Sequence, residues 1–273
     1  MSDDFLQAMA VASRARADAA AAQLPPAELR ARIQELPRAP ALRRSGRFDL
    51  IAEVKLRSPA VGQLQSADGA SAAERALAYA KAGAAAVSVL TEPSRFDGSM
   101  ADLVAVAASL TSVAVPAMRK DFLVDSYQVL EARAAGAGGV LVILRMLRRN
   151  VLAQLIDTAV EQGLFVLLEA FDEQDIELAE SLVTERAAAK QQLLVGVNCR
   201  DLVTLQVVPG RLEALAPRLP ANILRVAESG VTTESDAARM AACGYDLALV
   251  GSALMTHANP AALLANMLAA ARR

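Results

Sequence analysis

The sequence has few of the residues on which several kinds of functional site depend. Tryptophan is absent, aromatic residues make up 3% of the chain, and histidine occurs once, as His257. A single histidine excludes a metal site built from two histidines. The two cysteines, Cys199 and Cys243, are too few for a disulfide framework or a cysteine zinc site and are typical of a reducing compartment. We therefore expect an enzyme of this composition to use lysine, glutamate or aspartate as its acids and bases.

Long apolar runs and an excess of one charge are also lacking. No run approaches the ~18–20 apolar residues of a membrane span, and the start of the chain, Met1-Ser2-Asp3-Asp4, is acidic where a signal peptide is basic. The chain has 28 basic and 30 acidic residues, so it has no large net field that would attract nucleic acid or an anionic membrane. These features predict a cytoplasmic protein without a nucleic-acid or membrane partner.

The chain is nevertheless rich in the material of a large core. It has 273 residues, of which 54% are hydrophobic, and this length fits either two small domains or one (β/α)8 barrel of ~250 residues. Short runs rich in Val, Leu and Ile alternate with Ala-rich helical stretches, which is typical of successive β-then-α units. Eight such runs occur, at Leu50–Val54, Ala85–Leu90, Val113–Met118, Gly139–Leu144, Leu164–Leu168, Leu193–Val197, Ile223–Ala227 and Leu247–Val250.

Eight is the number of strands that closes a parallel barrel. A helix ending in Ala-Gly or a near variant precedes several runs, as at Ala82-Gly83 and Ala135-Gly136, and glycine there favours a tight αβ turn. The rival architecture is an open doubly wound sheet, but its Gly-x-Gly-x-x-Gly fingerprint after the first strand is missing. We expect an N-terminal helical extension over residues 1–47 and a single (β/α)8 barrel over residues 48–273.

Polar side chains follow most of the apolar runs, where parallel barrels carry their active sites. Glu53 and Lys55 are two positions apart on one strand, so both side chains point to the same side of it. One such pair could simply seal the barrel. Six polar groups at one mouth are costly to bury unless they are used, which predicts a catalytic site. The candidates are Glu53, Lys55, Lys120, Glu169, Asn198 and Glu228.

Ser-Gly turns after the last two runs indicate an anion site. Ser229-Gly230 and Gly251-Ser252 stand where the backbone N–H groups of barrel strands seven and eight commonly bind phosphate. Ser58, in a loop that also contains Gly62, is a further candidate. Two adjacent strands with such turns predict a phosphorylated small-molecule substrate.

Taken in order, the motifs resemble indole-3-glycerol phosphate synthase, the lyase of tryptophan biosynthesis that closes the indole ring. The resemblance covers essentially the whole chain, including the extension before the barrel. Seven motifs carry it: Leu50–Pro59, Ser88–Glu92 with Phe96–Ser99, Arg119–Phe122 with Tyr127-Gln128, Leu167–Glu169, Gly196–Leu202, Ala227–Gly230 and Val250–Met255.

The resemblance implies a TIM barrel and an aromatic amino-acid biosynthetic enzyme that needs no cofactor. It implies conversion of 1-(2-carboxyphenylamino)-1-deoxyribulose 5-phosphate to indole-3-glycerol phosphate, with release of carbon dioxide and water. This decarboxylase chemistry calls for ammonium acids and a carboxylate base in a partly dehydrated pocket. It also implies other enzymes of tryptophan biosynthesis as candidate partners.

The resemblance assigns roles position by position. Lys120 resembles the general acid that protonates the ketone, and Lys55 the lysine that holds the anthranilate carboxylate and acts as acid in the dehydration. Glu169 resembles the general base and Glu53 the carboxylate that orients the lysines and the substrate amine. Asn198 and Glu228 complete the site, with Arg200 in support. The phosphate contacts are Ser58, Ser229, Gly230, Gly251 and Ser252, and the apolar wall is Pro59, Phe96, Phe122 and Leu141.

Four positions depart from the family pattern without touching a proposed acid or base. Ala60 stands where a second serine is common, Cys199 where Asn or Ser is usual, Gly138-Gly139 where an Ala-Asp pair is usual, and Ala170-Phe171 where an apolar and then a polar residue are usual. They bear on substrate affinity and loop detail more than on reaction type.

Two other functions remain compatible with the residues alone. In a Schiff-base aldolase or isomerase, a barrel lysine such as Lys120 would attack the carbonyl of a sugar phosphate. A degenerate barrel would bind ligands or serve as an assembly subunit without catalysis.

Overall fold

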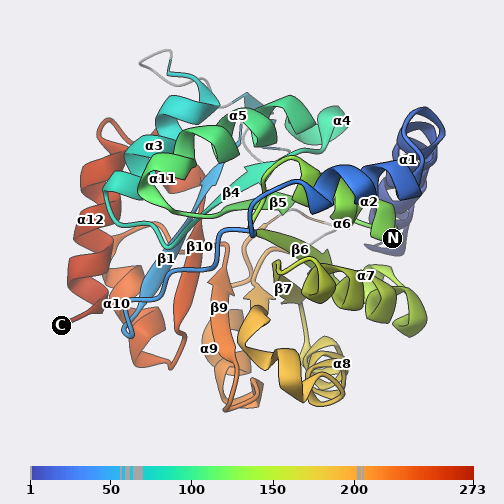
Figure 1. Ribbon diagram of the computed structural model, residues 1–273. Coiled ribbons are helices and arrows are strands. Elements are labelled where there is room, and N and C mark those ends of the chain that lie inside the picture. Colours follow the sequence, from blue (N-terminus) through green and yellow to red (C-terminus); the bar gives the residue numbers. More distant parts are fainter. Residues whose placement is uncertain (1, 56, 59–61, 64–69, 202–203, 205) are drawn as a thin grey trace.

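The computed structural model describes residues 2–55, 57–58, 62–63, 70–201, 204 and 206–273. Eight parallel strands form a closed barrel, in the spatial order β1-β10-β9-β8-β7-β6-β5-β4, and helices surround it (Figure 1). This confirms the predicted single (β/α)8 barrel. The barrel strands are β1 (Asp49–Val54), β4 (Ala86–Leu90), β5 (Ala117–Lys120), β6 (Gly139–Ile143), β7 (Phe165–Ala170), β8 (Leu193–Asn198), β9 (Leu224–Glu228) and β10 (Leu247–Val250). A separate antiparallel pair joins β2 (Arg57–Ser58) to β3 (Gly62–Gln63).

Helices fill the connections between strands. Several begin where the sequence supplies a cap; at the start of α3, for example, the Ser71 hydroxyl accepts from the Glu74 amide and the Glu74 side chain binds the Ser71 amide. The α-helices are α1 (Ser2–Gln23), α2 (Pro26–Gln34), α3 (Ala72–Lys81), α4 (Pro93–Phe96), α5 (Met100–Leu110), α6 (Ser126–Ala134), α7 (Arg149–Glu161), α8 (Glu173–Thr184), α9 (Arg211–Leu215), α10 (Glu234–Ala242), α11 (Ser252–Thr256) and α12 (Pro260–Ala271). The 3-10 turns are η1 (Thr111–Val113), η2 (Leu144–Met146), η3 (Ala187–Gln192) and η4 (Ala216–Arg218). No helix in the described ranges combines the length and the apolar character that a membrane crossing requires.

The third apolar run begins later as a strand than its composition predicts. Val113 closes a 3-10 turn, Ala114 takes a left-handed conformation with φ 51°, and β5 starts only at Ala117. Pro116 has no N–H to donate to a neighbouring strand, so pairing cannot extend through it on that side. The prediction of a strand from Val113 was therefore wrong by four residues at its start.

The strand residues alternate between two apolar layers. On β1, Leu50, Ala52 and Val54 pack outward against the helices, whereas Ile51 packs inside the barrel. Glu53 and Lys55 continue the inward series of Ile51. The barrel wall thus directs their side chains to its central axis.

The first two helices pack beside α6, at the right of the view in Figure 1. The hydroxyl of Tyr127 on α6 donates to the carbonyl of Leu24, at the end of α1, at 2.8 Å. Gln128 Nε2 donates to the buried Ser13 Oγ at 2.8 Å. These contacts join residues before β1 to the barrel, while the division into an extension over 1–47 and a catalytic domain over 48–273 stays a prediction.

Candidate active site

A pocket opens where the barrel strands end, and it brings together the six polar candidates. Glu53, Glu169 and Glu228 project from β1, β7 and β9, and their side chains are almost completely buried. Lys120 and Asn198 are the last residues of β5 and β8, and Lys55 directly follows β1. Because the strands are parallel and adjacent, their ends meet at one mouth.

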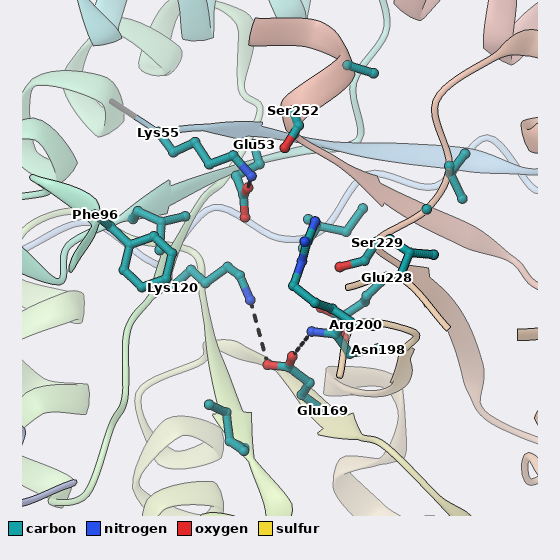
Figure 2. A pocket seen from close by; sticks show the side chains of 18 of the residues that line it. Glu53, Lys55, Phe96, Lys120, Glu169, Asn198, Arg200, Glu228, Ser229 and Ser252 are labelled. Atoms are coloured by element: carbon teal, nitrogen blue, oxygen red, sulfur yellow. Dashed lines mark hydrogen bonds and ion pairs between the residues drawn. The ribbon is translucent and has the colours of Figure 1, made fainter. Parts of the chain in front are cut away.

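Two ion pairs and one amide organise these groups (Figure 2). Lys55 Nζ lies 2.7 Å from Glu53 Oε1, and Lys120 Nζ lies 3.6 Å from Glu169 Oε2. Asn198 Nδ2 donates to the other oxygen of Glu169, and Asn198 Oδ1 accepts from the backbone amide of Arg200 at 2.9 Å. Glu169 is thus held from one side by an amide and from the other by an ammonium.

The charges in the pocket set the protonation states of Lys120 and Glu53. Burial alone would lower the pKa of Lys120, but the carboxylates of Glu169, Glu228 and Glu53 raise it above its ordinary value. Burial would likewise raise the pKa of Glu53, yet the ammonium groups of Lys55 and Lys120 hold it below its usual range. The pocket therefore keeps Lys120 charged and Glu53 ionised at neutral pH.

Glu228 has a different environment. Burial, followed by the charge of Glu169, raises its pKa well above the ordinary value. From the described residues, neither of its carboxyl oxygens receives a hydrogen bond, although both are buried. A Cβ added at Gly196 on the neighbouring strand would lie 2.1 Å from Glu228 Oε1, so glycine leaves the space that this carboxyl occupies. Glu228 therefore holds a proton more readily than an ordinary glutamate does.

The pocket has an aromatic side and a hydroxyl side. Figure 2 shows Phe96 across the pocket from Ser229 and Ser252. The rings of Phe96 and Phe122 have centroids 6.3 Å apart, and Phe5 of α1 meets Phe122 edge-on at 5.9 Å. An aromatic ligand group fits beside these rings, and a polar or anionic group fits at the opposite end.

The turn after β9 supplies part of the hydroxyl side. Ser229 and Gly230 both have left-handed backbone, with φ of 66° and 73°. A Cβ at Gly230 would lie 2.9 Å from Cys199 Sγ. The Cys199 thiol donates to the Ser229 carbonyl at 3.2 Å and packs in the layer between strands and helices. Cys199 supports this turn from behind and does not face the pocket.

Gly251 serves the ion pair as well as the turn. A Cβ at Gly251 would lie 2.3 Å from Glu53 Oε1 and 3.0 Å from Lys55 Nζ. Its lack of a side chain therefore leaves room for the Glu53–Lys55 pair.

Most of the predicted site residues line this pocket. They are Glu53, Lys55, Phe96, Lys120, Phe122, Glu169, Asn198, Arg200, Glu228, Ser229, Gly230, Gly251 and Ser252. The structure does not place the side chains of two others. Pro59 is outside the described residues, and Ser58 is described only as backbone of β2. The functional roles of all these residues stay predictions.

Leu141 is not among the described residues that line the pocket. Its side chain is buried in the barrel interior, below the mouth, and Ile143, two positions farther along β6, lines the pocket instead. Both residues point inward, so the pattern of the strand gives the correct side but the wrong depth.

Sequence reasoning missed several lining residues, among them Phe5, Ile143, Phe171 and Val207. Phe171 follows Glu169 by two positions on the same side of the chain, so strand alternation could have found it. Phe5 belongs to α1, and nothing in its local sequence shows that this helix reaches the barrel mouth.

A family model described as indole-3-glycerol phosphate synthase matches residues 7–267. The chain is 45% identical over 237 residues to the indole-3-glycerol phosphate synthase of a Nocardioides species, which covers 86% of both chains. It is 41% identical over 252 residues to the enzyme of that name from Mycobacterium tuberculosis, which covers 92% of this chain and 84% of the relative.

Solved structures share the barrel at much lower identity. A 3-hexulose-6-phosphate synthase from Salmonella typhimurium superposes with a TM-score of 0.58 at 15% identity, covering 82% of this chain and 98% of that one. An orotidine 5'-phosphate decarboxylase from Pyrococcus horikoshii gives 0.54 at 16%, covering 83% and 99%. These two similarities concern the fold alone. The match along nearly the whole chain and the identity to the two bacterial relatives show that this chain belongs to the indole-3-glycerol phosphate synthase family.

Proposed function

We propose that the protein is a decarboxylating lyase that converts 1-(2-carboxyphenylamino)-1-deoxyribulose 5-phosphate to indole-3-glycerol phosphate, carbon dioxide and water. The observation that carries this proposal is the Lys120–Glu169 pair, 3.6 Å apart, beside the Phe96 and Phe122 rings. The reaction needs an acid and a base next to a bound aromatic ring. The family membership of the chain supports the same conclusion.

In the ring closure, the aromatic carbon that bears the carboxylate attacks the ketone carbon. Lys120 donates a proton to the ketone oxygen as the new carbon–carbon bond forms. The carboxylate then leaves as carbon dioxide and its bonding electrons restore the aromatic ring. The neighbouring carboxylates keep Lys120 as an ammonium ion, which is the form that can donate this proton.

In the dehydration, the former ketone oxygen leaves as water. Lys55, after holding the anthranilate carboxylate, acts as the acid that protonates this oxygen. Glu169, as the base, takes the proton from the neighbouring carbon of the new ring, so that the carbon–carbon double bond of the indole forms. Glu53 orients Lys55 through its 2.7 Å contact. Asn198 orients Glu169, and Glu228 and Arg200 complete the polar lining.

The phosphate of the substrate is bound at the hydroxyl side by the turns at Ser229-Gly230 and Gly251-Ser252, with Ser58 as a further contact. Ser229 and Ser252 lie across the pocket from Phe96 (Figure 2), which supports a substrate with an aromatic group at one end and a phosphate at the other. Such anion binding by backbone N–H groups after the last two barrel strands is common.

A Schiff-base reaction at Lys120 is not favoured. Its nucleophile is the neutral amine, whose formation requires a lowered pKa, whereas three carboxylates raise the pKa of Lys120.

We place the reaction in the cytoplasm, in tryptophan biosynthesis, where the other enzymes of that route are candidate partners. Both cysteines are free thiols, as expected in a reducing compartment.

Addition of the carboxyphenylamino-deoxyribulose phosphate to the purified protein tests the proposal. Formation of the indole ring is followed by its fluorescence, and the tryptophan-free chain contributes little background in that region. The expected result is a steady rise that saturates with substrate. No rise above the rate without protein would contradict the proposed function.

A further inference from the structure

Arg16 connects the first helix to two buried carboxylates at the barrel mouth. Its Nη2 donates to Asp121 Oδ1 at 2.6 Å, and its Nη1 lies 3.5 Å from Glu92 Oε1. The side chains of Asp121 and Glu92 are 1% and 0% exposed, whereas that of Arg16 is 29% exposed. A buried carboxylate requires a partner of opposite charge. Arg16 supplies one guanidinium that lies against both.

Asp121 holds the two pocket residues on either side of it. Its Oδ1 accepts from the Phe122 amide at 2.8 Å, and its Oδ2 accepts from Thr91 Oγ1 at 2.8 Å and from Arg119 Nη2 at 3.3 Å. Asp121 directly follows Lys120, the last residue of β5. This network therefore fixes the direction in which the chain leaves β5 and, with it, the start of the Lys120 and Phe122 side chains.

Glu92 performs the corresponding task at the end of β4. It caps α4, because Oε1 accepts from the amide and the hydroxyl of Ser94 and Oε2 accepts from the Arg95 amide. Phe96, the last residue of α4, lines the pocket. The guanidinium of Arg16 thus lies between the turn that carries Phe96 and the turn that carries Phe122.

We propose that Arg16 is a positioning residue for the reaction. It acts through Asp121 and Glu92 and holds the Lys120 acid and the two rings of the aromatic wall in fixed relation. Arg16 is not among the described residues that line the pocket, so it does not touch the substrate. This inference rests on the proposed function, in which the aromatic carbon must meet the ketone while Lys120 protonates it. A displacement of about 1 Å in such an arrangement can cost on the order of 100-fold in rate.

Arg14 offers a matched control on the same helix. Its guanidinium contacts the Asp125 carboxylate and the Val124 carbonyl, so it also joins α1 to the segment after β5, but it does not contact either carboxylate bound by Arg16. Arg16→Ala should lower kcat by ~10-fold or more, as expected for misplaced catalytic groups. Arg14→Ala should change kcat by less than about 3-fold, a difference below 1 kcal/mol in the activation barrier. Arg16→Lys should lose less kcat than Arg16→Ala, because an ammonium keeps the charge. It should not reach the wild-type value, because one nitrogen cannot contact both carboxylates as the two terminal nitrogens of the guanidinium do.

A double-mutant cycle distinguishes positioning from loosened docking of α1. If Arg16 acts through Asp121, the kcat losses of Arg16→Ala and Asp121→Asn should fall short of their sum in the double variant. Thermal unfolding of the same variants shows how much of each loss of kcat comes from a loss of folded stability. Equal losses of kcat in the Arg16→Ala and Arg14→Ala variants would mean that Arg16 merely docks the helix, and would overturn the proposal.

Backbone hydrogen exchange supplies a readout that needs no substrate. Amides of residues 90–96 should exchange faster in Arg16→Ala than in wild type or Arg14→Ala, because Arg16 contacts Glu92, whereas Arg14 contacts Asp125 and Val124. Unchanged exchange there would also overturn the proposal. A wild-type protein that forms no indole product would contradict the proposed function instead, and the exchange experiment would still decide whether Arg16 holds these strand ends.

Discussion

At the scale of residues, the site consists of a few charged side chains that lie close together in a small buried volume. Strand alternation predicts that Glu53 and Lys55 point to one side, and the structure confirms this with their 2.7 Å contact. Alternation gives no information on depth, which depends on how the strands tilt around the barrel. For that reason it cannot tell that Ile143, and not Leu141, reaches the pocket.

Replacement of Lys120 should nearly abolish turnover. Lys120→Ala removes the group that we propose as the acid of the ring closure, so kcat should fall by at least ~100-fold while the substrate still binds. Lys120→Arg should fail as well, because arginine keeps its proton at neutral pH. Steady-state kinetics by indole fluorescence measure both variants, with thermal unfolding as the control for folding. A loss of kcat smaller than ~100-fold in Lys120→Ala would contradict the assignment of Lys120 as the general acid.

The raised pKa of Glu228 predicts a pH-dependent effect on stability. In the unfolded chain this carboxyl ionises at its ordinary pKa, whereas burial and Glu169 oppose ionisation in the folded protein. Its contribution to the free energy of unfolding is thus fully present below the ordinary pKa and is lost as the pH rises through the folded pKa. Glu228→Gln should therefore gain stability relative to wild type between pH 4 and pH 8.

Urea unfolding at the two pH values measures this gain. The exposed Glu161 provides the control variant, Glu161→Gln, which should show no comparable change. If the stability difference between Glu228→Gln and wild type is the same at pH 4 and pH 8, Glu228 does not resist ionisation in the folded protein.

At the scale of elements, the barrel strands could be predicted closely because their apolar runs are continuous and regularly spaced. The ends of the strands were predicted less accurately. Strands β7, β8 and β9 each extend to include the polar residue at the mouth, and β5 starts after Pro116. Pairing with neighbouring strands sets these limits, and a single run does not reveal its partners. The contribution of α1 to the pocket was missed for the same reason, since Phe5 reaches it only through tertiary packing.

Packing between β6 and β7 explains one departure from the family pattern. Gly139 of β6 pairs with Phe165 of β7, and a Cβ at Gly139 would lie 2.4 Å from the Phe165 ring. Gly139→Ala should therefore overpack the barrel interior and cost about 1–3 kcal/mol in the free energy of unfolding. Phe165→Leu should reduce that cost by clearing the ring, so the double variant should be more stable than the sum of the single changes predicts. Additive losses in urea unfolding would show that the ring does not need the space at Gly139.

At the scale of the whole molecule, one end of the barrel combines the acid–base groups, the aromatic wall and the Ser-Gly turns. The seven sequence motifs are dispersed along the chain, and closure of the barrel brings at least one residue of each to one pocket. The first helix, α1, adds the aromatic ring of Phe5 and the guanidinium of Arg16 to this end. Composition alone excluded a metal site built from two histidines. Which residues line the pocket together could be established only from the three-dimensional structure.

In the proposed reaction, Lys120 protonates the ketone as the ring closes, and the carboxylate of the substrate then leaves as carbon dioxide. The most direct measurement uses substrate labelled in the aromatic carboxylate and compares released carbon dioxide with indole formed, in wild type and in Lys120→Ala. The account predicts one equivalent of labelled carbon dioxide per indole in the wild type and loss of both in the variant. Release of carbon dioxide without indole, or unchanged formation of both products in Lys120→Ala, would contradict it.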